Sequence, residues 1–267
     1  MKNHYYTHYY GNKRNEIETI LPLINLDNIT TIIEPFAGSS AMSYYISTIY
    51  PKRFKYILND NDKINYQLFN VSKDPEKTQK FNENINKLID EWNTYEDDVS
   101  RKAFYVSIEK NTLEGYIFTY KYCNRRPTFY PFLSCIKQIK PFKLQDFPVF
   151  NFYNNEDITY SNIDGVEIIK NNYNAGNDRL FLIDPPYLKS SKKYKIYNNL
   201  NMDIYDWILD FEDLLLNNEN KFLFILEIIE EVEAIFSNFK TLSVYEKKYG
   251  MNGKQGRRTT SHIVYEN

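Results

Sequence analysis

The chain has 267 residues, of which 42% are hydrophobic, so it can bury a sizeable core and its composition excludes wholesale disorder. Its formal net charge of −2 excludes a general basic field that would attract nucleic acid, so any such binding must rely on local basic patches. The two cysteines do not have the spacing of a zinc or redox site, so we expect no metal. The sequence has no apolar run long enough to cross a bilayer and no secretory signal pattern, which predicts a soluble, cytoplasmic protein.

Residues 8–24 combine a glycine turn with an amphipathic helical pattern, which Pro22 is expected to end. Lys13 stands two residues after Gly11, at the start of this pattern. A lysine in such a turn can place its ammonium group beside a carboxylate or a phosphate. The alternative is an ordinary solvated lysine beside a turn.

A strand is predicted at residues 30–33 and a helix at residues 41–49, with the sequence Glu34-Pro35-Phe36-Ala37-Gly38-Ser39-Ser40 between them. A strand, a glycine turn and a helix N-terminus in this order are typical of nucleotide-cofactor sites, because small residues let the backbone approach the ligand closely. The turn does not follow the GxGxxG pattern. The glutamate that closes the strand suits a cationic amino group better than a pyrophosphate.

A second strand is predicted at residues 56–58 and is closed by Asn59-Asp60-Asn61-Asp62. An acid at the end of the second strand, about 20 residues after the glycine turn, is well placed to accept hydrogen bonds from ribose hydroxyls. Either acid can instead cap the helix predicted at residues 63–69. Both roles are compatible if Asp60 contacts the ribose and Asp62 caps the helix.

Residues 74–114 are predicted to be helical, with an apolar stripe that is more typical of packing than of a binding face. The stripe consists of Phe81, Ile85, Leu88, Ile89 and Trp92.

The character changes in residues 115–147, where aromatic and basic side chains alternate. Basic groups neutralise phosphates and aromatic rings stack on unpaired bases, so this stretch is the best candidate for a nucleic-acid surface. The alternative is a tyrosine-rich packed subdomain with a solvated charged face. The residues concerned are Tyr116, Phe118, Tyr120, Lys121, Tyr122, Arg125, Arg126, Phe129, Tyr130, Phe132, Lys137, Lys140 and Lys143.

The second half of the chain continues an α/β alternation. Asp164 precedes a helical segment that ends near Asn171, where it can accept from a cofactor's adenine amine or merely cap the helix. Further elements are predicted as a strand at 180–183, a helix at 204–216, a strand at 221–226 and an acidic helix at 227–236.

The most informative residues are Asp184-Pro185-Pro186-Tyr187, which directly follow the strand at 180–183. Neither proline can donate a ladder hydrogen bond, so the chain leaves the sheet at the edge where open α/β sheets bind ligands. The Asp184 carboxylate and the Pro185 carbonyl can accept from an exocyclic aromatic amine and favour a directed lone pair on its nitrogen. Tyr187 can stack on the ring, and the prolines preorganise both acceptors. A simple strand-ending turn is the alternative.

Two basic segments follow this block. Residues 189–195 carry Lys192 and Lys193 in a loop beside the predicted pocket, and residues 249–258 are glycine-spaced and end in Arg257 and Arg258. Both segments are compatible with contacts to phosphates.

Taken together, these motifs resemble the N6-adenine methyltransferases of the GATC-methylating DNA adenine methylase family. Their order is that of class alpha, with the cofactor motifs first, a target-recognition insert next and the catalytic motif last. The matching segments are residues 9–13, 34–40, 59–62, 122–132, 163–165, 184–187 and 249–258.

The resemblance implies a Rossmann-like α/β fold with a mixed sheet, in which residues 1–70 and 151–267 form the catalytic domain around a helical and aromatic target-recognition insert at 71–150. It implies S-adenosylmethionine as the cofactor and N6 of an adenine, flipped out of DNA, as the methyl acceptor. The implied catalytic residues are Asp184, Pro185, Pro186 and Tyr187. The implied cofactor contacts are Tyr9, Lys13, Glu34, Pro35, Phe36, Gly38, Asp60, Asp164 and Asp184. The nucleic-acid contacts expected from the basic segments described above are Lys121, Arg125, Arg126, Lys192, Lys193, Arg257 and Arg258.

The chain also departs from the family pattern at three positions. Ser40 replaces the last glycine of the cofactor loop, Asn12 replaces a glycine of the opening element, and His8 replaces a lysine that helps to read the GATC site. The recognition sequence is therefore not carried over. Methylation of RNA, for example near the end of an mRNA, and a non-catalytic nucleic-acid-binding subunit stay open, as does the oligomeric state.

Overall fold

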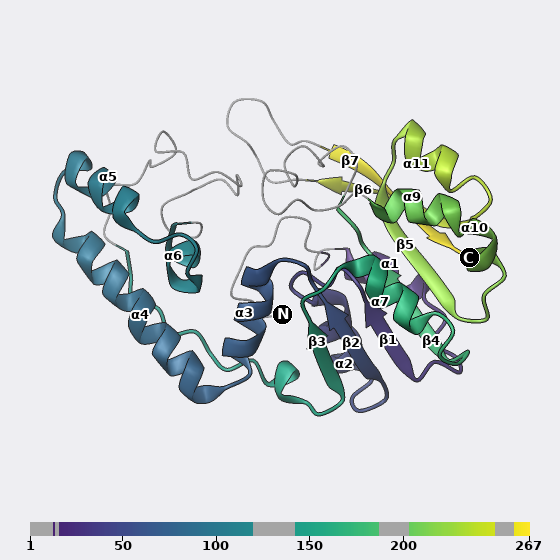
Figure 1. The fold of residues 1–267 in the computed structure, drawn as a ribbon, viewed down its shortest axis with the longest axis horizontal. Coiled ribbons are helices and arrows are strands. Elements are labelled where there is room, and N and C mark those ends of the chain that lie inside the picture. The colour runs from purple at the N-terminus through teal and green to yellow at the C-terminus, as the bar shows by residue number, and fades with distance from the viewer. Residues whose placement is uncertain (1–12, 14–15, 120–141, 187–202, 249–258) are drawn as a thin grey trace. The chain divides into compact units, whose positions relative to one another are not determined.

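The computed structural model describes residues 13, 16–119, 142–186, 203–248 and 259–267 (Figure 1). The chain divides into two compact units. Residues 12–61 and 156–267 form the sheet unit, and residues 62–155 form the helical unit. The domain limits predicted at residues 70 and 150 stay a prediction.

The sheet unit is built on a seven-stranded mixed sheet in the order β3-β2-β1-β4-β5-β7-β6. β1 to β5 run parallel, and β7 is antiparallel to both of its neighbours, β5 and β6. The first five strands follow the order of Rossmann folds, so the predicted mixed α/β fold class is confirmed. The strands are β1 (Thr31–Glu34), β2 (Lys55–Asn59), β3 (Ile158–Ser161), β4 (Arg179–Ile183), β5 (Lys221–Glu227), β6 (Lys240–Lys248) and β7 (Thr259–Glu266).

Helices cover the central strands. The elements of this unit are α1 (Ile17–Ile20), the 3₁₀ turn η2 (Leu21–Leu23), α2 (Ala41–Ile49), α7 (Gly165–Asn172), α9 (Asp203–Asp210), α10 (Glu212–Leu216) and α11 (Glu230–Ile235) (Figure 1). α7, α9, α10 and α11 pack in one core cluster with alternate residues of the strands, such as Phe181 and Phe222, whose rings stack 4.4 Å apart.

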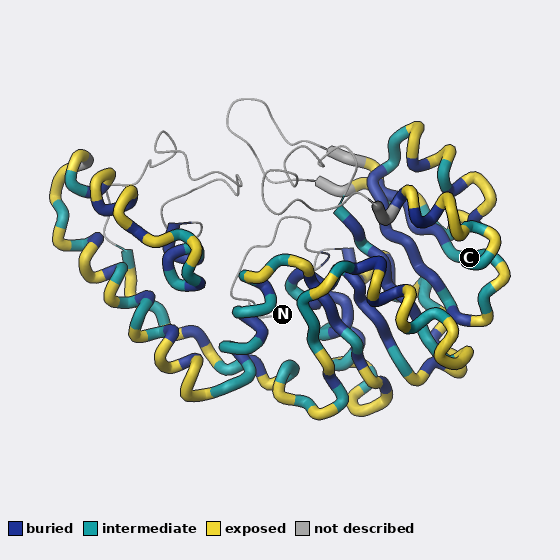
Figure 2. The backbone as a smooth tube through the Cα atoms, in the orientation of Figure 1, coloured by how far each residue is buried: buried dark blue, intermediate teal, exposed yellow. Residues whose placement is uncertain are grey.

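The central strands are buried along most of their length, as Figure 2 shows in dark blue. Leu180, Phe181, Leu182 and Ile183 of β4 are all buried, because parallel strands are covered on both faces. That is why these strands are continuous apolar runs in the sequence. It also means that polar chemistry is confined to the strand ends.

Two predicted helices differ from the structure. The helix predicted at 204–216 is divided at Phe211 into α9 and α10. The acidic helix predicted from residue 227 begins at Glu230, because Glu227 still pairs with His262 in the β5–β7 ladder. Its glutamates are exposed, as expected for a solvated face.

The helical unit contains α3 (Lys63–Ser72), α4 (Pro75–Thr94), α5 (Asp98–Ser107), α6 (Leu113–Ile117) and the 3₁₀ turn η5 (Asn151–Asn154). Acceptor side chains cap four of these helices. Asp62 accepts from the backbone of Ile64 at 2.8 Å, which confirms its predicted cap on α3. Asp74, Asp97 and Thr112 cap the next three helices in the same way.

The apolar stripe of α4 lies in the core, as predicted. Phe81, Ile85, Ile89 and Trp92 are buried. Trp92 packs in an aromatic cluster with Phe104, Phe118 and Phe142, and its ring stacks on Phe142 at 5.3 Å. Phe118 is therefore a core residue, so its predicted place on a base-stacking surface is wrong.

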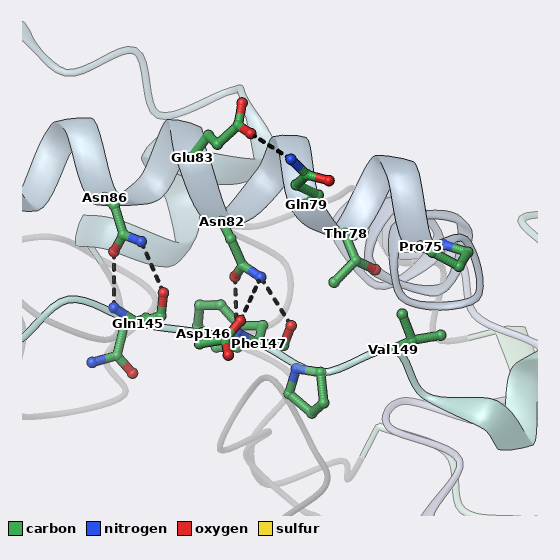
Figure 3. Close-up of a pocket in the computed structure, with 11 residues that line it drawn as sticks. Pro75, Thr78, Gln79, Asn82, Glu83, Asn86, Gln145, Asp146, Phe147 and Val149 are labelled. Atoms are coloured by element: carbon green, nitrogen blue, oxygen red, sulfur yellow. Dashed lines mark hydrogen bonds between the residues drawn. The ribbon is translucent and has the colours of Figure 1, made fainter.

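The polar edge of α4 holds an extended segment by a row of asparagines (Figure 3). Asn82 exchanges two hydrogen bonds with the backbone of Phe147, and Asn86 exchanges two with Gln145, all between 2.8 and 2.9 Å. Asn93 does the same with Phe142. Each amide therefore satisfies both an N–H and a C=O of a segment that belongs to no helix or strand. An open pocket of about 510 Å³ runs alongside.

We expect Asn86→Ala to lower the free energy of unfolding by about 1–2 kcal/mol, because it leaves two backbone groups of Gln145 without their partner. Urea titration measures the loss. Gln79→Ala is the matched control on the same helix, because the exposed Gln79 bonds to the exposed side chain of Glu83 and its loss should cost less than about 0.5 kcal/mol. Equal costs for the two variants would contradict this account.

Within the described residues, no helix combines the length and the apolarity needed to cross a membrane.

Candidate functional site

The carboxyl ends of β1 and β4 meet at the point where the strand order reverses. β1 pairs with β2 on one side and with β4 on the other, so successive connections leave the sheet in opposite directions from here. Crevices at such points are where α/β sheets bind ligands. Glu34 is the last residue of β1, and Asp184 directly follows β4.

Lys13 reaches this edge from the N-terminal segment. Its Nζ donates to Oδ2 of Asp184 at 2.5 Å, and the two side chains are 3% and 23% exposed. Of the two readings of Lys13, the solvated one is therefore wrong. The pairing balances a buried ammonium with a carboxylate that solvent and ligands can still reach.

Glu34 is buried beside this pair and accepts from the backbone N–H of Ser43 at 2.6 Å. Burial raises the pKa of its carboxyl to about 7, against the hydrogen bonding by Ser43, which lowers it. The Asp184 carboxylate raises the pKa further and the Lys13 ammonium lowers it. Near neutral pH the site therefore holds a carboxyl group that a cationic ligand would ionise.

The loop after β1 is held against the loop after β2 by Asp60. The backbone N–H of Gly38 donates to Oδ2 of Asp60 at 2.7 Å, in a buried position. Gly38 has a φ of 51°, a left-handed conformation that glycine adopts at little cost.

Ser40 also has a φ of 51°, with a ψ of 35°. The family pattern that the loop resembles has glycine here, and a side chain in this conformation costs about 1 kcal/mol. The hydroxyl of Ser40 is buried, and within the described residues it has no hydrogen-bond partner. Serine in place of glycine at position 40 thus keeps the left-handed turn of the loop, at the cost of backbone strain.

Asn59 is a positioning residue that the sequence analysis did not single out. Its Nδ2 donates to the carbonyls of Pro35 and Ile163, at 2.9 and 3.0 Å, and its Oδ1 accepts from Ser161 and the backbone of Ile163. It is 0% exposed. One amide at the end of β2 therefore ties together the loops that follow β1 and β3. The signal in the sequence that could have identified Asn59 is its position as a polar residue at the end of an apolar strand.

Phe36 packs at the start of α7, against the glycine that follows Asp164. A Cβ atom on Gly165 would lie 2.4 Å from the Phe36 ring, so the ring packs directly against this glycine. Asp164 caps α7 by accepting from the backbone of Val166 at 2.8 Å. The capping reading of Asp164 is confirmed, and its contact with a cofactor stays a prediction.

The start of the Asp-Pro-Pro-Tyr block lies as predicted, at the end of a buried strand. Asp184 and Pro186 are half-buried and Pro185 is buried. The hydroxyl of Tyr205 on α9 donates to the carbonyl of Pro186 at 3.4 Å, a support that sequence reasoning missed.

Several predicted site residues lie outside the described part of the chain. They are Tyr9, Lys121, Arg125, Arg126, Tyr187, Lys192, Lys193, Arg257 and Arg258. Their catalytic, cofactor and nucleic-acid roles stay predictions. Among the described residues no group of three or more His, Cys, Asp or Glu side chains is placed to hold a metal ion.

The residues at this edge fit a nucleoside cofactor with a cationic amino-acid portion. A buried carboxyl whose pKa lies near 7 suits a cationic group, and its burial beside Asp184 is the observation on which the fit rests. The left-handed turn at Gly38 lets the backbone come close to a ligand, and Asp60 lies against that turn.

Three of the solved structures that match the chain, all at low sequence identity, are methyltransferases. The human methyltransferase 10 domain containing protein is 7% identical, with a TM-score of 0.40, and the match covers 94% of this chain and 79% of that one. A SAM-dependent O-methyltransferase from Thermotoga maritima is 10% identical with a TM-score of 0.37, over 94% and 64% of the two chains. The rRNA methyltransferase aviRa from Streptomyces viridochromogenes is 10% identical with a TM-score of 0.39, over 97% and 86%.

No curated protein sequence matches the chain. A family model matches residues 9–135, slightly less than half of the sequence, and it describes the D12 class N6 adenine-specific DNA methyltransferases. This segment contains Lys13, Glu34, Gly38 and Asp60. The match supports the N6-adenine methyltransferase family and S-adenosylmethionine as the cofactor.

Proposed function

We propose that the protein transfers the methyl group of S-adenosylmethionine to N6 of an adenine in DNA. The observation that carries the proposal is the meeting of Asp184, Lys13 and Glu34 at the carboxyl ends of β1 and β4. The family match to residues 9–135 supports the cofactor and the acceptor atom.

The cofactor supplies a methyl group on a positively charged sulfur. Glu34 would accept from the cationic amino group of its amino-acid portion, and Asp60 from its ribose hydroxyls. Phe36, which packs against Gly165, and Asp164, which caps α7, would line its adenine side. Gly38 leaves room for the backbone to approach.

Asp184 and the carbonyl of Pro185 would accept from the two N–H groups of the target amine. Accepting from both directs the nitrogen lone pair, which in a free adenine is delocalised into the ring. Methyl transfer would form the N–C bond and break the C–S bond of the cofactor, and one proton would leave the nitrogen. Asp184 is partly exposed, so water can take that proton. Tyr187 would hold the flipped base by stacking.

Nucleic acid would be held by basic side chains outside the described residues. Arg125 and Arg126, with Lys121, lie in the segment between α6 and residue 142, and Lys192, Lys193, Arg257 and Arg258 lie in the two basic segments. Because the net charge is −2, contacts with phosphates must come from such local groups.

The proposal is tested by incubating the protein with labelled S-adenosylmethionine and matched pools of DNA and RNA, followed by nucleoside analysis. We expect N6-methyladenine in the DNA pool. Methylation of the RNA pool alone would show that the substrate is RNA and not DNA, with the same transfer to N6 of adenine. Cofactor binding without methylation of either pool would contradict an enzymatic function.

We expect Asp60→Ala to weaken S-adenosylmethionine binding by about 1.5–3 kcal/mol, because it removes an acceptor from the ribose and releases the Gly38 turn. Calorimetry measures the change. Asp62→Ala is the matched control, since Asp62 caps α3 and should change stability alone. Unchanged affinity in Asp60→Ala would remove this residue from the cofactor site.

A further inference from the structure

A buried polar cluster lies in the sheet unit beside the residues already described. Oε2 of Glu16 accepts from the hydroxyl of Tyr245 at 2.7 Å and faces Nδ1 of His262 at 3.2 Å. Glu16 is 4% exposed and His262 is 0% exposed. His262 stands on β7 directly opposite Tyr245 on β6 and opposite Glu227 on β5. The cluster therefore ties the N-terminal segment to the antiparallel half of the sheet.

Glu16 is also joined to Lys13 through the backbone. Its N–H donates to the carbonyl of Lys13 at 2.8 Å, and its own carbonyl accepts from the backbone of Thr19 and Ile20 in α1. Glu16 thus closes the turn that begins at Lys13 and opens the helix that follows. Contacts that hold the Glu16 side chain in place therefore also hold the backbone of Lys13.

This anchoring matters because Lys13 meets its partner at the end of a long side chain. A lysine stem has four flexible bonds, and a buried ion pair is favourable only when its geometry is well fixed. Burying a carboxylate, a phenol and an imidazole is itself costly unless each is hydrogen-bonded. In this cluster the Tyr245 hydroxyl and the His262 imidazole both approach the same carboxylate oxygen of Glu16. Glu16 lies three residues after Lys13 in the chain.

We propose that Glu16, Tyr245 and His262 are positioning residues, which fix the segment that carries Lys13 so that its ammonium meets Asp184. The cluster reaches the pair through the hydrogen bond that the Glu16 N–H donates to the Lys13 carbonyl, so it acts on Lys13 through the backbone. The role in catalysis rests on the proposed function, whereas the role in forming the pair does not.

The structural part is tested on the protein without cofactor. A double-mutant cycle of Lys13→Met and Asp184→Asn gives the coupling between the two residues from urea unfolding. We expect the coupling to change the unfolding equilibrium constant about tenfold in the wild-type background and less than about twofold in the Glu16→Gln background. Equal coupling in both backgrounds would overturn the proposal.

Milder variants keep the test informative if Glu16→Gln does not fold. Tyr245→Phe removes only the hydroxyl, and it should reduce the coupling severalfold, while Tyr265→Phe on the neighbouring strand should leave it unchanged. His262→Leu should abolish most of the coupling. His262→Asn should restore it, because its amide nitrogen can donate to the Glu16 oxygen that Nδ1 faces. Full coupling in His262→Leu would overturn the role of the imidazole.

The catalytic part is tested by single-turnover methylation at saturating cofactor. His262→Leu should slow the reaction about tenfold in the wild-type background and have no further effect in the Lys13→Met background, since it acts through Lys13. If the imidazole had a purely structural role, His262→Leu would lower the rate by the same factor in both backgrounds. That result would overturn the catalytic part of the proposal. If the wild-type protein methylates no nucleic acid, the proposed function fails, and the unfolding cycle still decides whether the cluster positions Lys13.

Discussion

Asp184→Ala is expected to lower the rate of single-turnover methylation by about 100–1,000-fold at saturating cofactor. The carboxylate accepts from the target amine, and this interaction strengthens as positive charge develops on the nitrogen during transfer. An interaction that is stronger in the transition state than in the ground state appears in kcat. The loss should therefore persist when both substrates saturate the protein.

The pairing with Lys13 decides how this experiment must be controlled. Asp184→Ala leaves a buried ammonium without its partner, which is strongly destabilising, so circular dichroism and urea unfolding must accompany the assay. Asp184→Asn keeps an acceptor oxygen and loses the charge, and its rate should fall between those of the wild type and Asp184→Ala.

Asp178 offers a matched control, because it stands just before β4 while Asp184 stands just after it. Its side chain accepts from the hydroxyl of Thr30 at the opposite edge of the sheet. Asp178→Asn should leave the rate of methyl transfer unchanged. A folded Asp184→Ala protein that transfers methyl groups at the wild-type rate would falsify the mechanism.

The sequence predicted four of the five parallel strands, β1, β2, β4 and β5, and the strand ends that carry the site, but it missed β3. Buried parallel strands are continuous apolar runs, and the polar residue that ends each run is visible beside it. Glu34 and Asp184 were found in this way, and both lie at the edge where they were expected. The helix cap at Asp62 was equally local, since a cap involves only neighbouring residues.

Interactions between distant parts of the chain were not predictable in the same way. The sequence left the turn at Lys13 open between a lysine beside a carboxylate and a solvated one, and only the fold identifies its partner, a carboxylate 171 positions away. The cluster of Glu16, Tyr245 and His262 likewise joins three segments. β6 was missed because it is an edge strand with exposed polar residues, so its apolar signal is weak.

The last expected result concerns Glu34, whose pKa is raised from 4.5 to about 7 by burial. Between these two values the folded protein keeps a proton that the unfolded chain has lost, so this carboxyl lowers stability as pH rises through that window. Above pH 7 the full cost is present. We therefore expect Glu34→Gln to match the wild type near pH 4.5 and to exceed its free energy of unfolding by about 3 kcal/mol near pH 8. Urea unfolding at several pH values measures the difference.

The same group links cofactor binding to proton release. If the cationic amino group of S-adenosylmethionine binds beside Glu34, it favours the ionised carboxylate, and at pH 7 about half a proton should leave the protein on binding. Calorimetry in buffers of different ionisation enthalpy measures this release. Glu34→Gln should bind the cofactor more weakly and release no proton, while the exposed Glu18→Gln should behave as the wild type. A binding enthalpy that is identical in all buffers would mean that no proton is released and that Glu34 does not contact the cofactor. The raised pKa of Glu34 would then reflect its burial alone.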